Sequence, residues 1–111
     1  GGYAGAKRML WLMAHYANGV SSELGLDIKF QVLVPLQIVG ETRLGHEAAQ
    51  AYAKRKGLTT EKFLAGFGKP LPPRQFGEHV VTILTDPKYA TGTAFGIRGD
   101  NGITSLDAPP A

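Results

Sequence analysis

The fold is decided by the stretch Asp27-Ile28-Lys29-Phe30-Gln31-Val32-Leu33-Val34-Pro35. Alternate residues from Ile28 to Val34 are apolar, and the last three before the proline are apolar on both faces, as in a parallel strand covered by helices on each side. Pro35 ends the strand, because proline has no N–H to donate to a neighbouring strand. We therefore expect a strand over residues 28–35 within an α/β sheet.

A helix is expected before this strand, from Tyr3 to Asn18. Alanine and unbranched residues dominate the segment, the first β-branched residue is Val20, and Gly19 can end the helix. Apolar residues go almost all the way round, which is typical of a helix buried on more than one side, for example between a sheet and a partner subunit. These residues are Met9, Leu10, Trp11, Leu12, Met13, Tyr16 and Ala17.

Glycines and prolines divide the rest of the chain into short elements. We expect helices over 46–56, ended by Gly57, from Thr59 or Thr60 to Phe67, and over 73–84, and a strand over 93–98. A turn is expected over 100–102 and a disordered tail over 105–111. The apolar stripe of the last helix is predicted to comprise Phe76, Val80, Val81 and Leu84.

The order of these elements predicts an incomplete sheet. Only two strands are visible, and two strands do not form a stable sheet on their own. Parallel α/β sheets also need cover on both faces. We therefore expect residues 1–104 to form an α/β domain whose sheet includes strands outside this sequence.

The composition is that of one small globular domain. The 111 residues suffice for a single domain, and 43% hydrophobic with 19% charged residues excludes a disordered or fibrous chain. The net charge of +3 includes the cluster Lys54-Arg55-Lys56. We interpret this cluster as a solvated helix end and expect no nucleic-acid binding, because no basic stripe interleaved with aromatic residues runs along the chain.

The absence of several signals narrows the class further. No apolar run reaches the roughly 18 residues that a membrane-spanning helix needs, and no signal-peptide pattern is present. There is no cysteine, which excludes disulfides and thiolate catalysis, so we expect a cytoplasmic protein that contacts no membrane. The chain opens with Gly1-Gly2 and no methionine, which we interpret as a trimmed or partial start.

Tyr3 and Lys7 are the strongest candidates for chemistry. At positions i and i+4 they share one face of a helix, one turn apart. A phenol has an ordinary pKa of about 10, and a nearby ammonium lowers the pKa of the phenol by favouring the phenolate. Such a tyrosine can pass a proton to or from an alcohol or carbonyl oxygen. The small residues between the two leave room for a flat ligand.

The same spacing occurs a second time, in Tyr52-Ala53-Lys54-Arg55-Lys56. We interpret Tyr52 as a surface helix residue, because charged residues follow it and the helix ends at a glycine instead of leading into a buried strand. The histidines, His15, His46 and His79, lack metal-ligand spacing, and we expect no metal site.

Nearly the whole chain, in order, resembles the C-terminal half of short-chain dehydrogenases/reductases. Tyr3-Ala4-Gly5-Ala6-Lys7 with a long apolar helix and a strand ending in proline resembles the catalytic helix and the strand after it. The stretch from Pro73 to Pro87 resembles the last helix of the family. The stretch from Tyr89 to Asp100, which includes Thr91-Gly92 and Gly99-Asp100, resembles the last strand and turn of the family.

The resemblance implies a fold and a reaction. The fold would be the C-terminal half of a doubly wound, Rossmann-like parallel sheet with flanking helices in three α/β/α layers, without the N-terminal dinucleotide-binding half. The intact protein would be an NAD(P)-dependent oxidoreductase moving a hydride between the nicotinamide and a carbonyl or alcohol substrate. NAD and NADP cannot be distinguished here, because the deciding residue follows the second strand, in the half that is absent. Subunits of this family commonly pair through the tyrosine-bearing helix, so a homo-oligomer through Tyr3–Asn18 is expected.

The resemblance also implies residue roles. Tyr3 would be the general acid/base, and Lys7 would lower its pKa and hold the ribose of the nicotinamide. Pro35 would lie beside the nicotinamide ring, Ile38 would meet its carboxamide through the backbone, and residues 40–68 would bind the substrate. The family usually has glycine after the proline, where this chain has Leu36. The family threonine five residues after the proline is also missing, which leaves Thr42 as the nearest candidate for that cofactor contact.

A second hypothesis belongs to another class. The catalytic serine and the glycine-rich phosphate loop of the family are absent from this sequence. The chain could therefore be a non-catalytic, stand-alone half domain that acts as an oligomerisation or interaction module.

Overall fold

The computed structural model describes residues 2–37, 42–66, 70–99 and 102–106, with the side chain of Tyr3 outside that description. Four helices, one 3-10 turn and three strands occupy these ranges. They are α1 (Gly2–Glu23), β1 (Val32–Pro35), α2 (Arg43–Arg55), α3 (Thr60–Ala65), α4 (Pro73–Thr85), η1 (Pro87–Tyr89), β2 (Ala94–Arg98) and β3 (Gly102–Ser105).

The three strands form one mixed sheet in the order β1-β2-β3. β1 pairs in parallel with β2, from Val32 opposite Ala94 to Pro35 opposite Ile97. This confirms the predicted α/β class with a parallel pair. β3 runs antiparallel to β2, with Arg98 opposite Gly102, so the expectation of a parallel sheet holds for only one of the two pairings.

β3 corrects the prediction of a disordered tail from residue 105. Gly102, with φ of 68°, begins the strand, and Ser105 is its last residue. The connection after Arg98 is so short that the chain returns directly beside β2. A strand of four residues, with Ile103 as its one large apolar side chain, has too little periodicity to stand out in the sequence. Residues 107–111 lie outside the described part of the chain.

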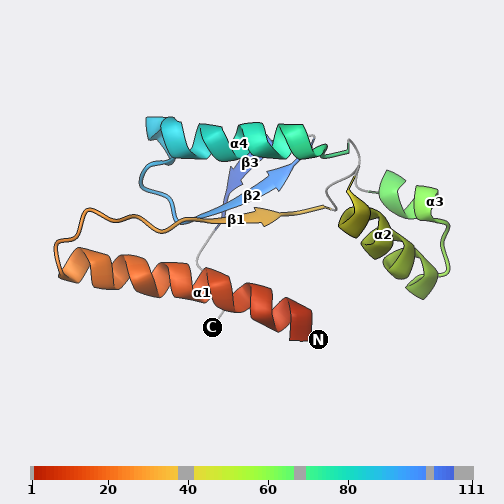
Figure 1. The fold of residues 1–111 in the computed structure, drawn as a ribbon, viewed down its shortest axis with the longest axis horizontal. Helices are drawn as coiled ribbons and strands as arrows, with labels where there is room; N and C mark the ends of the chain where they lie inside the picture. The colour runs from red at the N-terminus through yellow and green to blue at the C-terminus, as the bar shows by residue number, and fades with distance from the viewer. Residues whose placement is uncertain (1, 38–41, 67–69, 100–101, 107–111) are drawn as a thin grey trace.

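Helices cover both faces of the sheet (Figure 1). α4 lies on one side of the strands and α1 on the other, which gives three layers. The core lies between the sheet and α4, where Leu71, Ile83, Phe95 and Ile97 are fully buried. Tyr89 adds an edge-to-face ring contact with Phe95, with the ring centroids 5.4 Å apart.

The buried stripe of α4 differs from the predicted one. Ile83 is 2% exposed, whereas Val81 is 59% and Leu84 71% exposed. Phe76, Val80 and Ile83 follow one another at helical spacing, so they share the face toward the sheet. The predicted stripe therefore held Phe76 and Val80 correctly and was wrong for Val81 and Leu84.

α1 is longer than predicted, because Gly25 ends it and Gly19 does not. Gly25 has φ of 65°, a left-handed conformation that glycine adopts without strain. The Leu26 N–H donates to the Ser21 carbonyl at 2.9 Å, which closes the characteristic glycine cap of a helix. Gly19 stays within the helix, on an exposed position.

β1 is shorter than predicted, because side chains of α1 bind the backbone that precedes it. The Ser21 hydroxyl donates to the Ile28 carbonyl at 2.7 Å. Asn18 binds both the N–H and the carbonyl of Phe30, at 2.8 Å each. These backbone groups are thus satisfied by a helix instead of a strand, and the ladder begins only at Val32.

α2 and α3 form a separate helical hairpin beyond the end of the sheet (Figure 1). Its small core consists of Ala49, Ala53 and Phe63. α2 begins at Arg43, three residues earlier than predicted, and ends as predicted before Gly57, whose φ is 68°. The second helix was expected from Thr59 or Thr60 to Phe67, and its described part ends at Ala65.

Candidate functional site

The carboxyl ends of β1 and β2 and the N-terminal ends of α1 and α4 lie at the same end of the molecule (Figure 1). The hairpin of α2 and α3 lies at this end too. In open α/β sheets, ligands bind outside the carboxyl ends of the parallel strands. This end is therefore the candidate functional site, and Lys7, Pro35 and Thr42 all belong to the elements that form it.

The face of α1 that packs toward the sheet is mostly polar. Its least exposed residues recur at helical spacing: Trp11, Ala14, His15, Asn18 and Ser21. Trp11 Nε1 and His15 Nε2 are buried without a hydrogen-bond partner among the described residues. Four residues before Trp11 on the same face is Lys7, and four residues before Lys7 is position 3. The helical register thus aligns the two predicted catalytic positions with the face that meets the sheet.

Lys7 itself is exposed on the first turns of α1. Gly5 lies two residues from each of the two positions and therefore on the opposite, outward face of α1, where an added Cβ would meet no atom within 4 Å. Room for a flat ligand beside Tyr3 and Lys7 stays a prediction. The side chain of Tyr3 lies outside the description, so its role stays a prediction.

Pro35 is the exposed last residue of β1. Val32 and Leu36 donate to the carbonyls of Thr93 and Ile97, at 2.8 and 3.0 Å. In a parallel ladder alternate residues bond to the same neighbour, so the N–H positions of residues 33 and 35 face the other edge of β1. The missing N–H of Pro35 therefore costs no hydrogen bond within this sheet, and that edge of β1 has no strand partner in the described part of the chain.

Leu36, directly after Pro35, packs over Gly96. A Cβ added at Gly96 would lie 2.6 Å from Leu36 Cδ1 and 3.3 Å from Leu106 Cδ2. The two leucine side chains thus occupy the space that a side chain on residue 96 would need.

Gln37 is a buried polar residue at this end of the sheet that the sequence reasoning did not single out. It is only 8% exposed, and its Oε1 accepts a hydrogen bond of 2.9 Å from the Gly99 N–H, just beyond β2. A polar residue directly after the strand-ending proline and leucine was the one available signal, and it does not reveal a partner 62 residues away. Ile38, the predicted carboxamide contact, lies outside the described residues.

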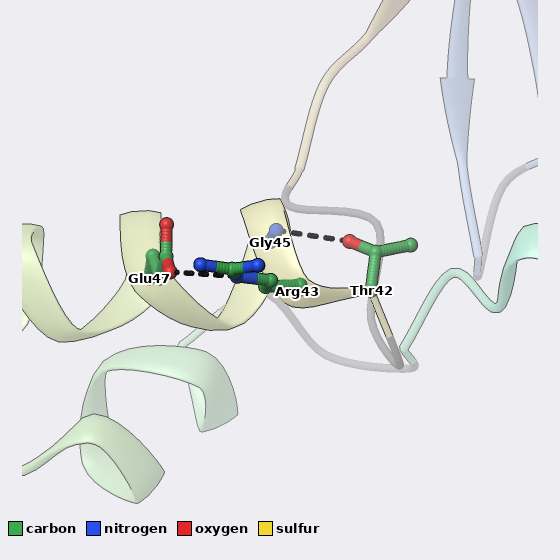
Figure 2. A network of polar contacts seen from close by, with 4 residues as sticks. All are labelled: Thr42, Arg43, Gly45 and Glu47. Carbon is green, nitrogen blue, oxygen red and sulfur yellow. Dashed lines mark hydrogen bonds and ion pairs between the residues drawn. The ribbon is translucent and has the colours of Figure 1, made fainter.

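Thr42 is the N-cap of α2 (Figure 2). Its Oγ1 accepts a hydrogen bond of 2.9 Å from the Gly45 N–H, which satisfies one of the free donors at the helix start. Arg43 and Glu47 form an exposed ion pair of 3.2 Å on the next turn. The cap is a structural role that the sequence reasoning did not assign. The cofactor contact of Thr42 stays a prediction.

The second Tyr-x-x-x-Lys segment is a surface feature, as predicted. Tyr52 is 42% exposed, and its ring stacks on Phe63 with 6.0 Å between centroids. The Lys56 ammonium lies 5.6 Å from the centroid of the same Phe63 ring. Both residues thus bind α2 to α3, away from the sheet.

Comparison with family models, with characterised proteins and with solved structures finds no match to this chain. Among the described residues, no group of three His, Asp or Glu side chains could hold a metal ion. In those same ranges, no helix is long and apolar enough to cross a membrane.

Proposed function

We propose that the chain is the catalytic-helix part of an NAD(P)-dependent oxidoreductase of the short-chain dehydrogenase/reductase type. The observation that supports the proposal is that the first turns of α1, which carry Lys7, the start of α2, which Thr42 caps, and the end of β1 at Pro35 meet at the carboxyl end of the parallel strands (Figure 1). These residues are up to 35 positions apart in the sequence, and the resemblance assigned all three to one cofactor site.

The residues at this end fit the nicotinamide end of a dinucleotide. Lys7 on the sheet-facing stripe can donate to ribose hydroxyls. The exposed ring of Pro35 offers an apolar surface for the nicotinamide. The bound nicotinamide would supply or accept the hydride.

The roles of the protein side chains follow from their chemistry. Tyr3 donates a proton to the carbonyl oxygen of the substrate during reduction and removes it from the alcohol during oxidation. Lys7 favours the phenolate form of Tyr3 through its positive charge. The hairpin of α2 and α3 borders this end of the sheet and contributes to the choice of substrate. The proposal places this enzyme in the cytoplasm.

The proposal includes further strands at the open edge of β1. In a Rossmann-like sheet, the strands that bind the rest of the dinucleotide would continue from this edge. Leu33 turns its backbone groups toward it, and its side chain packs on the core. A parallel strand placed there would bind the free backbone groups of β1, and it would bury more of the sheet-facing side of α1.

The outward face of α1 supports self-association as a part of the same function. Met9, Leu12, Met13 and Tyr16 are between 47% and 77% exposed on this face, opposite the polar stripe. With Ala17 they line a shallow apolar depression. The expectation that the helix is buried on more than one side is not met within this chain alone, and a second copy would bury the outward face. This exposed apolar face of α1 also favours the alternative hypothesis, in which the chain is an interaction module without catalytic activity.

The test is a tyrosine substitution in the intact protein with a built-in control. Tyr3→Phe should abolish turnover of carbonyl substrates, by at least about a hundredfold for the loss of a general acid/base, while binding of NADH or NADPH remains. Tyr52→Phe, at the second Tyr-x-x-x-Lys segment, should leave turnover unchanged. Unchanged turnover in Tyr3→Phe would overturn the assignment, and an intact protein that binds neither nucleotide would favour the module.

A further inference from the structure

Gln37 occupies an unusual place in the ladder between β1 and β2. The last backbone bond from β1 is that of the Leu36 N–H to the Ile97 carbonyl, at 3.0 Å. In a continued parallel ladder, the Gly99 N–H would donate next, to the Leu36 carbonyl. It donates to Gln37 Oε1 instead, at 2.9 Å. The side chain of Gln37 thus takes the place of one backbone rung.

The chemistry of this contact requires an acceptor. A backbone N–H can only donate, so the oxygen of the Gln37 amide faces Gly99. Gln37 and Ser21 are the buried polar side chains of the described residues, and Gln37 is 8% exposed. Without the amide oxygen, the Gly99 N–H would remain in a half-buried place without its bond, which carries a free-energy cost.

We propose that Gln37 is a positioning residue for the cofactor site. Its side chain holds the carboxyl end of β1 against the residue that follows β2, while the backbone at Leu36 and Gln37 bends out of the ladder. This contact fixes the point at which the chain leaves the sheet, next to Pro35. The proposal rests on the proposed function, because that function places the nicotinamide beside Pro35.

A matched control lies at the other end of the same strand. Gln31, directly before β1, is half-buried, and its Nε2 donates to the carbonyls of Tyr89 and Gly92, at 2.9 and 3.2 Å. Replacing Gln31 removes a comparable amide contact between β1 and the region of β2, at the end away from the site. Gln31→Met therefore measures how much the loss of such a contact weakens nucleotide binding through stability alone. Any larger loss of affinity in Gln37→Met is due to the place of Gln37 beside Pro35.

The experiment combines amide exchange with nucleotide titration in the full-length protein. Gln37→Met keeps the size of the side chain and removes the oxygen, so the Gly99 amide should exchange on the order of tenfold faster. The dissociation constant for NADH or NADPH should rise by a similar factor. Gln37→Glu keeps an acceptor and should restore both values toward those of the wild type. Gln31→Met should change nucleotide affinity by less than about twofold, within the usual range of an additive, distant substitution.

Each result separates the two proposals. Unchanged Gly99 exchange in Gln37→Met shows that the contact does not hold this end of the sheet. Faster exchange with a nucleotide affinity equal to that of Gln31→Met overturns the positioning role and leaves the proposed function intact. A wild-type protein that binds neither nucleotide overturns both, and the exchange of Gly99 then still decides whether the contact exists.

Discussion

Asn18 on α1 pairs with the backbone of Phe30 as a neighbouring strand would. Its Nδ2 donates to the Phe30 carbonyl and its Oδ1 accepts from the Phe30 N–H, both at 2.8 Å. Nδ2 also lies 3.1 Å from Thr93 Oγ1, beside the start of β2. One side chain therefore joins α1, the segment before β1 and the entry to β2.

Removing the Asn18 amide should destabilise the domain. Asn18→Leu leaves both backbone groups of Phe30 without these bonds, and we expect a loss of about 1–2 kcal/mol in the free energy of unfolding, since the site is partly exposed. Asn18→Asp keeps the acceptor and should lose less. Urea denaturation of the two variants measures the difference, and equal stability of Asn18→Leu and wild type would contradict the role of this side chain.

Two glycines near β2 should differ in their tolerance of alanine. A Cβ at Gly92 would lie 2.3 Å from Phe95 Cζ, and Phe95 is 1% exposed and cannot move aside. We expect Gly92→Ala to cost about 1–3 kcal/mol, as overpacking of a core does.

Gly96→Ala should cost less than Gly92→Ala. The nearest atom is the tip of Leu36, a side chain that is 38% exposed and free to rotate toward solvent. Leu36→Ala should make Gly96→Ala close to neutral, because it removes the obstructing atom. Thermal unfolding of the single and double variants checks this, and additive effects would mean that the two residues do not interact.

The cap of α2 should depend on the Thr42 oxygen. Thr42→Val keeps the shape and removes the acceptor for the Gly45 N–H, which should cost about 1 kcal/mol of stability. Thr42→Ser keeps the oxygen and serves as the control. If Thr42 also contacts the cofactor, Thr42→Val should weaken NADH or NADPH binding more than its effect on stability explains. Fluorescence titration at a temperature where both variants are folded separates the two effects.

The outward face of α1 should determine the oligomeric state. Met9→Lys with Met13→Lys places two charges on the exposed apolar stripe, and burial of unpaired charges opposes association. We expect the mass in sedimentation equilibrium to fall to that of one subunit. Val81→Lys, at an equally exposed position on α4, is the control and should not change the mass. A wild-type protein that is already monomeric would rule out self-association through α1.

Most of the element order could be predicted from residues 2–98. The apolar run ending at Pro35, the proline at the start of α4 and the glycine after α2 each act through local backbone preferences, so they predicted β1, α4 and the end of α2. The beginning of β1 could not be predicted, because it depends on side-chain hydrogen bonds from Ser21 and Asn18 to the backbone of Ile28 and Phe30, and no local backbone preference encodes such bonds. The end of α1 is set by a local signal, the left-handed Gly25, where the prediction had chosen Gly19.

The candidate site divides in the same way. The sequence by itself determined the helical pairing of Tyr3 with Lys7 and the end of the strand at Pro35, because helical periodicity and the missing proline N–H are properties of neighbouring residues. Only the tertiary structure decided that Gln37 meets Gly99, that Leu36 fits over Gly96 and that β3 runs antiparallel beside β2. These contacts depend on the register between β2 and the strands on either side of it, which arises when residues far apart in the sequence pack together.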